Sequence, residues 1–285
     1  MKKIAIVCDS SVSFSKEELK RYDVYIVPNV ILHNEKAYLD QKTITKQEIN
    51  DLIESKEKVT TSQPNLGDIV TLLEKIKKEE YDHVFIITIS SALSGGYNAF
   101  VQASKIAELS NVSVVDSFSI GGVVQQAVKA VRKMNAENKS LKEIKDYLSF
   151  IFNNSTTYLF PKSLDQIIAS GRVSKTTGKL ASLLKIKTAV YFKKGKKSIE
   201  KFAVARTEKK IFSSIIKDLE KYNVNPKDYD LYFLQNKAKE QIKVFQDQLS
   251  EQIGEFKNYI SDLPAALSVH AGSKALVIQW CPKIK

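Results

Sequence analysis

The sequence predicts an α/β protein with a parallel-sheet sandwich in its N-terminal half and an α+β region with a largely antiparallel sheet in its C-terminal half. In the first half, short apolar runs alternate with amphipathic helical segments, as in a parallel sheet covered by helices on both faces. In the second half, residues 187–206 hold two apolar runs around a Lys-Gly-Lys turn, which indicates antiparallel pairing. With 285 residues, the chain is long enough for one large domain or two medium ones.

The helices and strands of the first half are predicted from hydrophobic periodicity and from helix capping motifs. A capping box, in which a Ser or Thr and a Glu three residues later bond each other's backbone, opens a helix. Three such boxes occur, at Ser15–Glu18, Thr45–Glu48 and Ser140–Glu143. Further helices are expected from Asn65, from about Tyr97 and from about Ile120. Strands are expected at 4–8, 24–32, 84–89 and 112–116.

The second half shows a different order of predicted strands and helices. A strand is expected in "TTYLFP" and a short helix in "SLDQIIASG", ending at Gly171. Helices near 208–222 and 239–253 then alternate with the strands "DLYFLQN", "FKNYIS" and "KALVIQWC". We place a boundary near residues 153–155 and predict two domains, 1–154 and 155–285.

Composition argues against a membrane-spanning, secreted or metal-binding protein. No apolar run approaches the roughly 20 residues of a membrane span, and the apolar start at Ile4–Cys8 is too short for a signal peptide, so a cytoplasmic protein is expected. Cys8 and Cys281 lie in expected strands and are interpreted as buried thiols rather than a disulfide or metal site. The three histidines lack metal-binding spacing, and no metal is expected.

The net positive charge of the chain comes entirely from the second half. Residues 1–150 hold 20 basic and 20 acidic side chains, whereas residues 151–285 hold 24 and 12. Residues 162–210 alone carry 14 basic and 3 acidic side chains. This pattern fits either a solvated lysine-rich surface or a basic face for an acidic or phosphate-bearing partner.

Four stretches predict a ligand site at the ends of the strands. They are "CDSS" (8–11), "TTSQP" (60–64), "ISSALSGG" (89–96) and "VDSFSIGG" (115–122). Ligands of parallel sheets bind beyond the carboxyl ends of the strands, and hydroxyls with helix N-terminal amides suit an anion. Such residues are also common in loops and caps, and we expect Asp9 and Asp116 to be N-caps or loop anchors and Trp280 to be core.

Several motifs follow one another along nearly the whole chain: "TSQPNLGD", "ISSALSGGYNA", "VVDSFS", "SGRVS", "LASLLKIK", "ARTEKK", "HAG" and "ALVI". In their order and spacing they resemble the DegV family of bacterial fatty-acid-binding proteins. It implies two α/β domains with a long-chain fatty acid between them. It also implies that the carboxylate is presented to an ATP-dependent fatty acid kinase, which makes an acyl-phosphate for phospholipid synthesis.

The resemblance also implies a set of ligand-binding residues. Those that match the family's motif are Thr61, Ser62, Ser94, Gly95, Gly96, Arg172 and His270. Hydroxyls and glycine amides would donate to the carboxylate, with Arg172 as the nearby cation and His270 closing the site. The family's His-x-Gly-Pro-Gly loop appears here as residues 270–274, without the proline and the last glycine. The family usually has Thr at Gly96, Gly at Ser170 and Pro at Thr188.

If polar residues bind the carboxylate of a fatty acid, a long apolar tunnel is needed for its alkyl chain. Its candidates are Leu180, Leu183, Leu184 and Ile186, which are equally plausible as core. For the partner kinase we expect a docking face near 193–197 and 206–210, with Arg206, Lys209 and Lys210 as its principal residues. No cofactor of this chain is expected, because ATP and Mg²⁺ belong to the kinase; transient contact with a membrane surface is a further expectation.

Alternatives from other classes remain open. Ser94 lies between a strand and a helix, as a hydrolase nucleophile would, with His270 as its base, although the G-x-S-x-G motif is absent. A lipid carrier without a kinase partner is a second alternative. Nucleic-acid binding by the basic half is a third, but no recognised motif supports it, and no nucleic-acid partner is expected.

Overall fold

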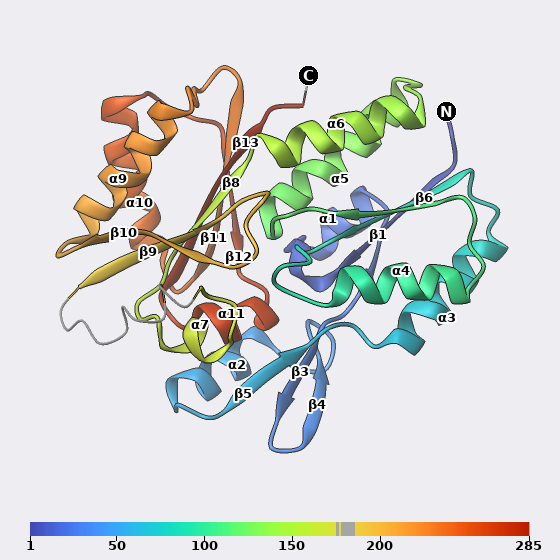
Figure 1. The fold of residues 1–285 in the computed structure, drawn as a ribbon, viewed down its shortest axis with the longest axis horizontal. Coiled ribbons are helices and arrows are strands. Elements are labelled where there is room, and N and C mark those ends of the chain that lie inside the picture. The colour runs from blue at the N-terminus through green and yellow to red at the C-terminus, as the bar shows by residue number, and fades with distance from the viewer. Residues whose placement is uncertain (175–176, 178–185, 285) are drawn as a thin grey trace.

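A parallel sheet organises the first half of the chain, as the alternation of apolar runs predicts. The computed structural model describes residues 1–174, 177 and 186–284 and places the two halves of the chain side by side (Figure 1). The sheet has four parallel strands in the order β2-β1-β6-β7. Its strands are β1 (Ile4–Asp9), β2 (Val24–Val27), β6 (His83–Thr88) and β7 (Val112–Asp116).

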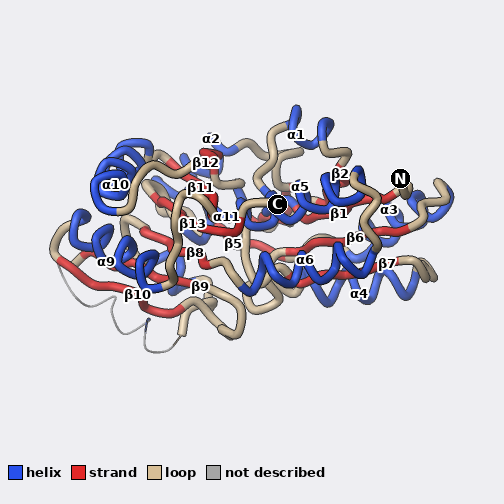
Figure 2. The backbone as a smooth tube through the Cα atoms, turned by 90° about the horizontal axis from the view of Figure 1, so that it is seen from above, coloured by secondary structure: helices blue, strands red, loops and turns tan. Residues whose placement is uncertain are grey.

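Helices cover both faces of this sheet because its central strands bury side chains in both directions. Ala5 and Val7 of β1 pack with α3 (Leu66–Lys78) and α4 (Gly96–Ile106) on one face. Alternate residues, such as Ile6, contribute to the core on the opposite face. That face carries α1 (Lys16–Arg21), α5 (Gly121–Ala136) and α6 (Leu141–Asn153). In Figure 1, α5 and α6 lie above these strands and α3 and α4 lie below them, whereas Figure 2 shows the four strands side by side. The doubly covered parallel sheet is confirmed.

All three predicted capping boxes are formed. Ser15, Thr45 and Ser140 each accept the backbone N–H of the glutamate three residues later, and that glutamate bonds back to the cap. They open α1, α2 (Lys46–Glu54) and α6, so the starts of these helices follow directly from local sequence.

The prediction of one strand at 24–32 is wrong. The chain breaks at Pro28, which has no N–H for a sheet ladder, and β3 (Val30–His33) joins a separate three-stranded antiparallel sheet. Its partners are β4 (Lys36–Leu39) and β5 (Val59–Ser62). Figure 1 shows this small sheet below the main one, and Thr61 of β5 contacts His270 of the second half.

The second half is built on a six-stranded sheet in the order β10-β9-β8-β13-β11-β12. Every neighbouring pair is antiparallel except β11 with β12, which confirms a largely antiparallel sheet. Its strands are β8 (Thr156–Phe160), β9 (Lys187–Phe192), β10 (Glu200–Ala205), β11 (Tyr229–Asn236), β12 (Asn258–Asp262) and β13 (Ala275–Pro282). The predicted division into two domains places its boundary just before β8.

Helices α9 (Glu208–Lys221) and α10 (Lys239–Gln252) cover the outer face of the six-stranded sheet. Two short helices, α7 (Asp165–Ala169) and α11 (Ala265–Ala271), lie near the small sheet. Helix α11 was not predicted from the sequence; its seven residues are mostly small and apolar.

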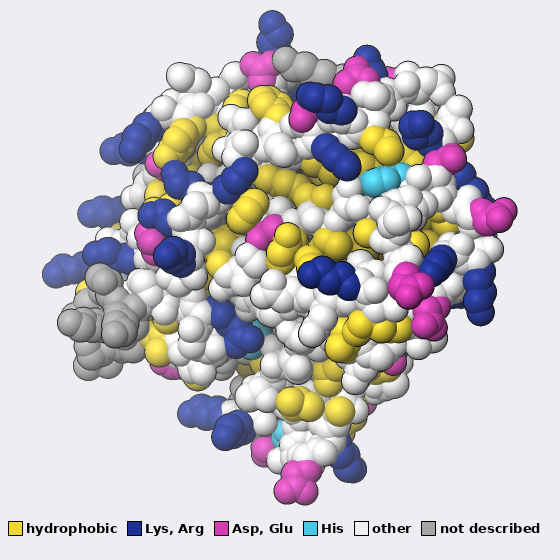
Figure 3. All heavy atoms as spheres, turned by 45° about the vertical axis from the view of Figure 1, so that its right-hand side comes forward, with side chains coloured by type: hydrophobic (Ala, Val, Ile, Leu, Met, Phe, Trp, Pro, Cys, Tyr) yellow, Lys and Arg dark blue, Asp and Glu magenta, His cyan; other side chains and the backbone are white. Residues whose placement is uncertain are grey.

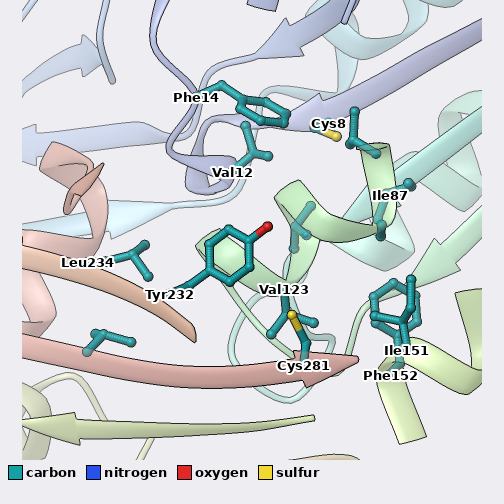
Figure 4. Packing of buried hydrophobic residues seen from close by; sticks show 14 of the residues in the cluster. Cys8, Val12, Phe14, Ile87, Val123, Ile151, Phe152, Tyr232, Leu234 and Cys281 are labelled. Carbon is teal, nitrogen blue, oxygen red and sulfur yellow. The ribbon is translucent and has the colours of Figure 1, made fainter. Parts of the chain in front are cut away.

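One hydrophobic core joins the inner face of the six-stranded sheet to the first half. Buried members come from both halves, and Figure 4 shows Cys8, Val123 and Tyr232 within it. Cys8 and Cys281 are both buried and free, which confirms the interpretation as buried thiols. Trp280 is only 4% exposed and is core, as expected, in the cluster on the outer side of the sheet.

The glycine pair of "SIGG" serves this interface rather than a ligand. A Cβ on Gly122 would lie 2.3 Å from Tyr232 Cβ, and one on Gly121 would lie 2.1 Å from Leu234 Cδ2. Gly121 also has φ +48°, which favours glycine. These glycines let the start of α5 approach β11, so the expectation that they help to form an anion site is wrong.

Two kinds of feature are absent from the described residues. No helix there is both long and apolar enough to cross a membrane. No cluster of three or more His, Cys, Asp or Glu side chains that could hold a metal ion occurs in the same part of the chain.

Candidate functional site

A cavity of about 370 Å³ lies between the two halves. Its floor is the inner face of the six-stranded sheet, because alternate residues of β8 point in opposite directions: Leu159 lines the cavity, whereas Tyr158 and Phe160 join the outer core. Most of its wall is apolar. Apolar lining residues are Ile89, Leu93, Ile120, Leu159, Ile167, Val190, Phe192, Ile199, Leu263, Ala266, Leu267, Ala271 and Val277.

The predicted ligand residues that line this cavity come from four separate segments. They come from the end of β5, the loop after β6, the segment after α7, and α11. Six of the seven predicted ligand residues line the cavity: Thr61, Ser62, Ser94, Gly95, Arg172 and His270. The fold therefore brings together residues more than 200 positions apart in the sequence.

Arg172 is a partly buried cation with no acidic partner among the described residues. Its Nε donates to Leu93 O at 3.0 Å and its Nη1 to Ser170 O at 2.6 Å. Burial lowers the pKa of the guanidinium, and no carboxylate offsets this effect. The group stays charged at neutral pH, so the cavity holds an uncompensated positive charge.

His270 is held by Thr61. Its Nε2 lies 2.6 Å from Thr61 Oγ1. Burial, and secondarily the nearby charge of Arg172, lower the pKa of His270 to about 4, so the ring is neutral at pH 7. A neutral ring leaves Arg172 as the positive charge at this end of the cavity.

The glycine-rich loop after β6 is closely packed. The Oγ of Ser94 accepts the N–H of Gly96 at 3.1 Å. Gly96 is buried and does not line the cavity. Its amide therefore contacts the lining residue Ser94 rather than the cavity itself. A Cβ on Gly95 would lie 2.0 Å from Gln63 Oε1, which means that Gly95 admits the Gln63 side chain at the cavity rim.

Ser94 and His270 do not pair. The ring nitrogen of His270 contacts Thr61, and the hydroxyl of Ser94 is engaged by Gly96. Within the described residues, the Ser–His contact that a hydrolase needs is not formed.

Of the four predicted strand-end loops, two line the cavity with polar groups. The loop 60–64 contributes Thr61, Ser62 and Gln63, and the loop 89–96 contributes Ser94 and Gly95. The loop 115–122 contributes only Ile120, and the loop 8–11 contributes no lining residue, so the expectation of a pocket shared by all four is wrong.

The loop 8–11 instead forms a buried polar network. Asp9 accepts the N–H of Ile89 at 2.7 Å and that of Ser11 at 2.9 Å, and Ser10 donates to Asp40 at 2.7 Å. Burial raises the pKa of Asp40 to about 6. Asp9 is thus the loop anchor that the sequence predicts. The prediction for Asp116 is also confirmed, because its Oδ1 accepts the N–H groups of Ser91 and Phe118.

The predicted tunnel residues do not account for the apolar wall. Ile186 is 37% exposed and lies outside the lining. The other three candidates, Leu180, Leu183 and Leu184, lie outside the described residues. The wall comes from strands, short helices and loops together, and the apolar runs of the strands identify their residues only as core.

Asn29, Gln63 and Tyr191 line the cavity but were not predicted from the sequence as site residues. Asn29 follows the Pro28 break and is 7% exposed, with its amide nitrogen 3.0 Å from Ser10 Oγ. In the sequence, the proline and the polar residue that interrupt the apolar run could have indicated that Asn29 does not belong to a continuous strand.

The predicted docking residues lie on the surface, but not as one cluster. Arg206, Lys209 and Lys210 are exposed at the start of α9. The turn 193–197 lies at the other end of β10, about 20 Å away for six strand residues. Figure 3 shows Lys and Arg side chains spread over one face of the molecule, most densely on its left side.

Fold and site define a class: an α/β protein whose two halves enclose an apolar cavity with a cationic, hydroxyl-rich end. The model of the DegV family, described as "Uncharacterised protein, DegV family", matches residues 3–283. This chain therefore belongs to the DegV family.

Three relatives illustrate the match. A DegV domain-containing protein of Staphylococcus aureus strain N315 is 36% identical over 191 residues, which cover 66% of either chain. The crystal structure of DegV, a fatty acid binding protein from Bacillus subtilis, has a TM-score of 0.84 at 27% identity and covers 99% of this chain and 100% of its own. A fatty-acid-binding DegV family protein from Thermus thermophilus has a TM-score of 0.89 at 24% identity over 99% and 100%.

Proposed function

We propose that this chain binds one long-chain fatty acid in the cavity, with the carboxylate beside Arg172 and the alkyl chain along the apolar wall. The observation that carries this proposal is the partly buried Arg172 cation without an acidic partner among the described residues. An anionic head group would supply the missing charge, and an apolar tail would suit the rest of the lining. The relatives described as fatty acid binding proteins support the same ligand class.

The energetics favour a ligand with both parts. Burial of a sixteen-carbon chain contributes roughly 12 kcal/mol at about 0.8 kcal/mol per CH₂. A buried carboxylate must be compensated by charge-assisted hydrogen bonds of about 1.5–3 kcal/mol each. Proposed donors are Thr61, Ser62, Ser94, the Gly95 amide, Arg172 and His270, with the Gly96 amide supporting Ser94.

The direct test is organic extraction of the purified protein followed by mass spectrometry. About one fatty acid per chain is expected, recovered as the free acid. Protein that remains empty after incubation with palmitate, or that carries a nucleotide instead, would contradict the proposal.

We further propose that the bound carboxylate is presented to an ATP-dependent fatty acid kinase, which forms an acyl-phosphate for phospholipid synthesis in the cytoplasm. The chain has no P-loop motif of its own. Phosphoryl transfer relies on positioning and on nearby cations, and Arg172 would lie beside the accepting oxygen. A role as a lipid carrier without a kinase is the alternative, and transient contact with a membrane surface stays a prediction.

Arg206→Ala tests the docking face. Fatty acid affinity is expected to stay unchanged, because Arg206 is exposed and lies outside the cavity lining. Acyl-phosphate formation with the cognate kinase should fall, and the remaining rate should depend less on salt, because a charged steering contact is lost. Lys227→Ala, an exposed lysine outside the proposed face, is the control. Equal loss of binding and turnover would place Arg206 in the pocket or the fold instead.

A further inference from the structure

The sheet beneath the cavity presents two rows of side chains that run across β9, β8 and β13. The first row is entirely apolar, whereas the second contains a hydroxyl and an amide. Strand pairing sets Val190, Leu159 and Val277 side by side in the first row, and Phe192, Thr157 and Gln279 in the second. All of these residues except Gln279 line the cavity.

The second row lies away from the end of the cavity that holds His270. Helix α11, which carries His270, ends beside the start of β13. There the side-chain amide of Asn236 donates to Gly272 O at 3.1 Å, and Asn236 pairs with Ala275. Gln279 follows four strand residues after Ala275, about 13 Å farther along. The second row therefore faces the alkyl chain of the proposed ligand rather than its carboxylate.

A hydrogen-bonded network surrounds the hydroxyl of Thr157, which is only 5% exposed. Its Oγ1 accepts Gln279 Nε2 at 2.7 Å and lies 3.0 Å from Ser119 Oγ. Gln279 Nε2 also donates to Ile120 O at 2.9 Å and lies 3.3 Å from Ser119 Oγ. Because Ile120 O can only accept a hydrogen bond, these contacts fix the orientation of the Gln279 amide.

The side-chain oxygen of Gln279 is a buried acceptor. Gln279 is fully buried, and no donor among the described residues reaches its Oε1. It lies between Val277 and Cys281, which both belong to the core on the cavity side of the sheet, so its side chain faces that side as well. Buried acceptors in proteins are almost always paired, and a donor from a ligand fits this position.

Together, the two side chains can offer one donor and one acceptor. When Ser119 donates its hydroxyl hydrogen to Thr157 Oγ1, the hydrogen of Thr157 is free to point into the cavity. Thr157 then supplies the donor and Gln279 Oε1 the acceptor. A hydroxyl group both donates and accepts, whereas a ketone only accepts and a methylene does neither. The pair therefore matches a hydroxyl group.

We propose that the preferred ligand of the cavity is a fatty acid with a hydroxyl group near the middle of its chain, and that Thr157 and Gln279 bind this hydroxyl. The inference rests on the proposed fatty acid binding and narrows its ligand class. An unsubstituted chain covers both polar groups with methylenes and leaves them unpaired. A site built to pair a hydroxyl binds the analogue without it less tightly.

The test compares stearate with stearate hydroxylated at carbon ten or at carbon twelve, by isothermal titration calorimetry. The parental protein is expected to bind at least one hydroxylated acid roughly tenfold more tightly than stearate. Thr157→Val keeps the shape of the side chain but removes its hydroxyl, and this preference should disappear. The corresponding ketone should gain less than the hydroxylated acid, because it has no hydrogen to donate to Gln279 Oε1.

Two controls match this experiment. Thr156 precedes Thr157 on β8, faces the other side of the sheet and lies outside the cavity lining, so Thr156→Val should keep the preference. Stearate hydroxylated at carbon two carries its hydroxyl beside the carboxylate. Its affinity relative to stearate should be the same in the parental protein and in Thr157→Val.

The outcomes separate this inference from the ligand assignment. Equal affinity of the parental protein for stearate and for both hydroxylated acids would overturn the hydroxyl site. An unchanged preference in Thr157→Val, or equal loss of it in Thr156→Val, would do the same. Failure of stearate and of every hydroxylated acid to bind would instead overturn the proposed function.

Discussion

Arg172→Ala is expected to weaken palmitate binding roughly 10- to 150-fold. In the proposed complex, the variant would lose a charge-assisted interaction with the fatty acid carboxylate, which would contribute about 1.5–3 kcal/mol. Because the cation would act only on a charged head group, affinity for hexadecanol should barely change. Isothermal titration calorimetry with both ligands measures this difference.

Two controls make the result specific. Arg206→Ala removes an arginine outside the cavity lining and should bind palmitate normally. Arg172→Lys keeps the charge but not the guanidinium geometry that contacts two carbonyl groups, and an intermediate affinity is expected. Parental affinity in Arg172→Ala, or equal loss for acid and alcohol, would show that Arg172 does not bind the carboxylate.

Gly122→Ala is expected to destabilise the fold by about 2–3 kcal/mol, at the upper end of the overpacking range. The new Cβ would lie 2.3 Å from Tyr232 Cβ and 2.4 Å from Cγ, so the start of α5 must move away from β11. Thermal unfolding should shift down by roughly 3–5 °C for a chain of this size. Urea unfolding followed by circular dichroism gives the corresponding free energy.

Gly67→Ala provides the matched comparison. Gly67 also lies in the first turn of a helix, but it is exposed, and its Cβ would meet only the Asn65 side chain, at 3.2 Å. Little change in stability is expected. If Gly122→Ala unfolds like the parent protein, the contact between α5 and β11 is looser than the structure indicates.

Local signals determined many element boundaries. The three capping boxes open their helices where expected, since each bond joins residues only three positions apart. Strand β7 spans the predicted 112–116 because its apolar, β-branched run is bounded by polar residues on both sides. The prediction of one strand at 24–32 was wrong because hydrophobicity alone does not show that the residues before and after Pro28 belong to different sheets.

The candidate site was only partly accessible from sequence. Motif resemblance named Thr61, Ser94, Arg172 and His270, and all four line one cavity. The apolar wall was not identified, because a strand residue such as Val190 has the same pattern whether it faces a core or a cavity. The role of the "SIGG" glycines was also misassigned, since close backbone approach to a ligand and to another strand both require glycine.

The sequence by itself determined the alternation of elements, the capped helix starts, the basic second half and the residue types of the polar mouth. These properties depend on near neighbours or on composition. Only the tertiary structure decided that His270 contacts Thr61, that Arg172 has no acidic partner among the described residues, and that the hairpin turn reaches Phe118. The reason is physical: such contacts join residues far apart in the chain, and their distances are set by how the sheets pack, which no local pattern encodes.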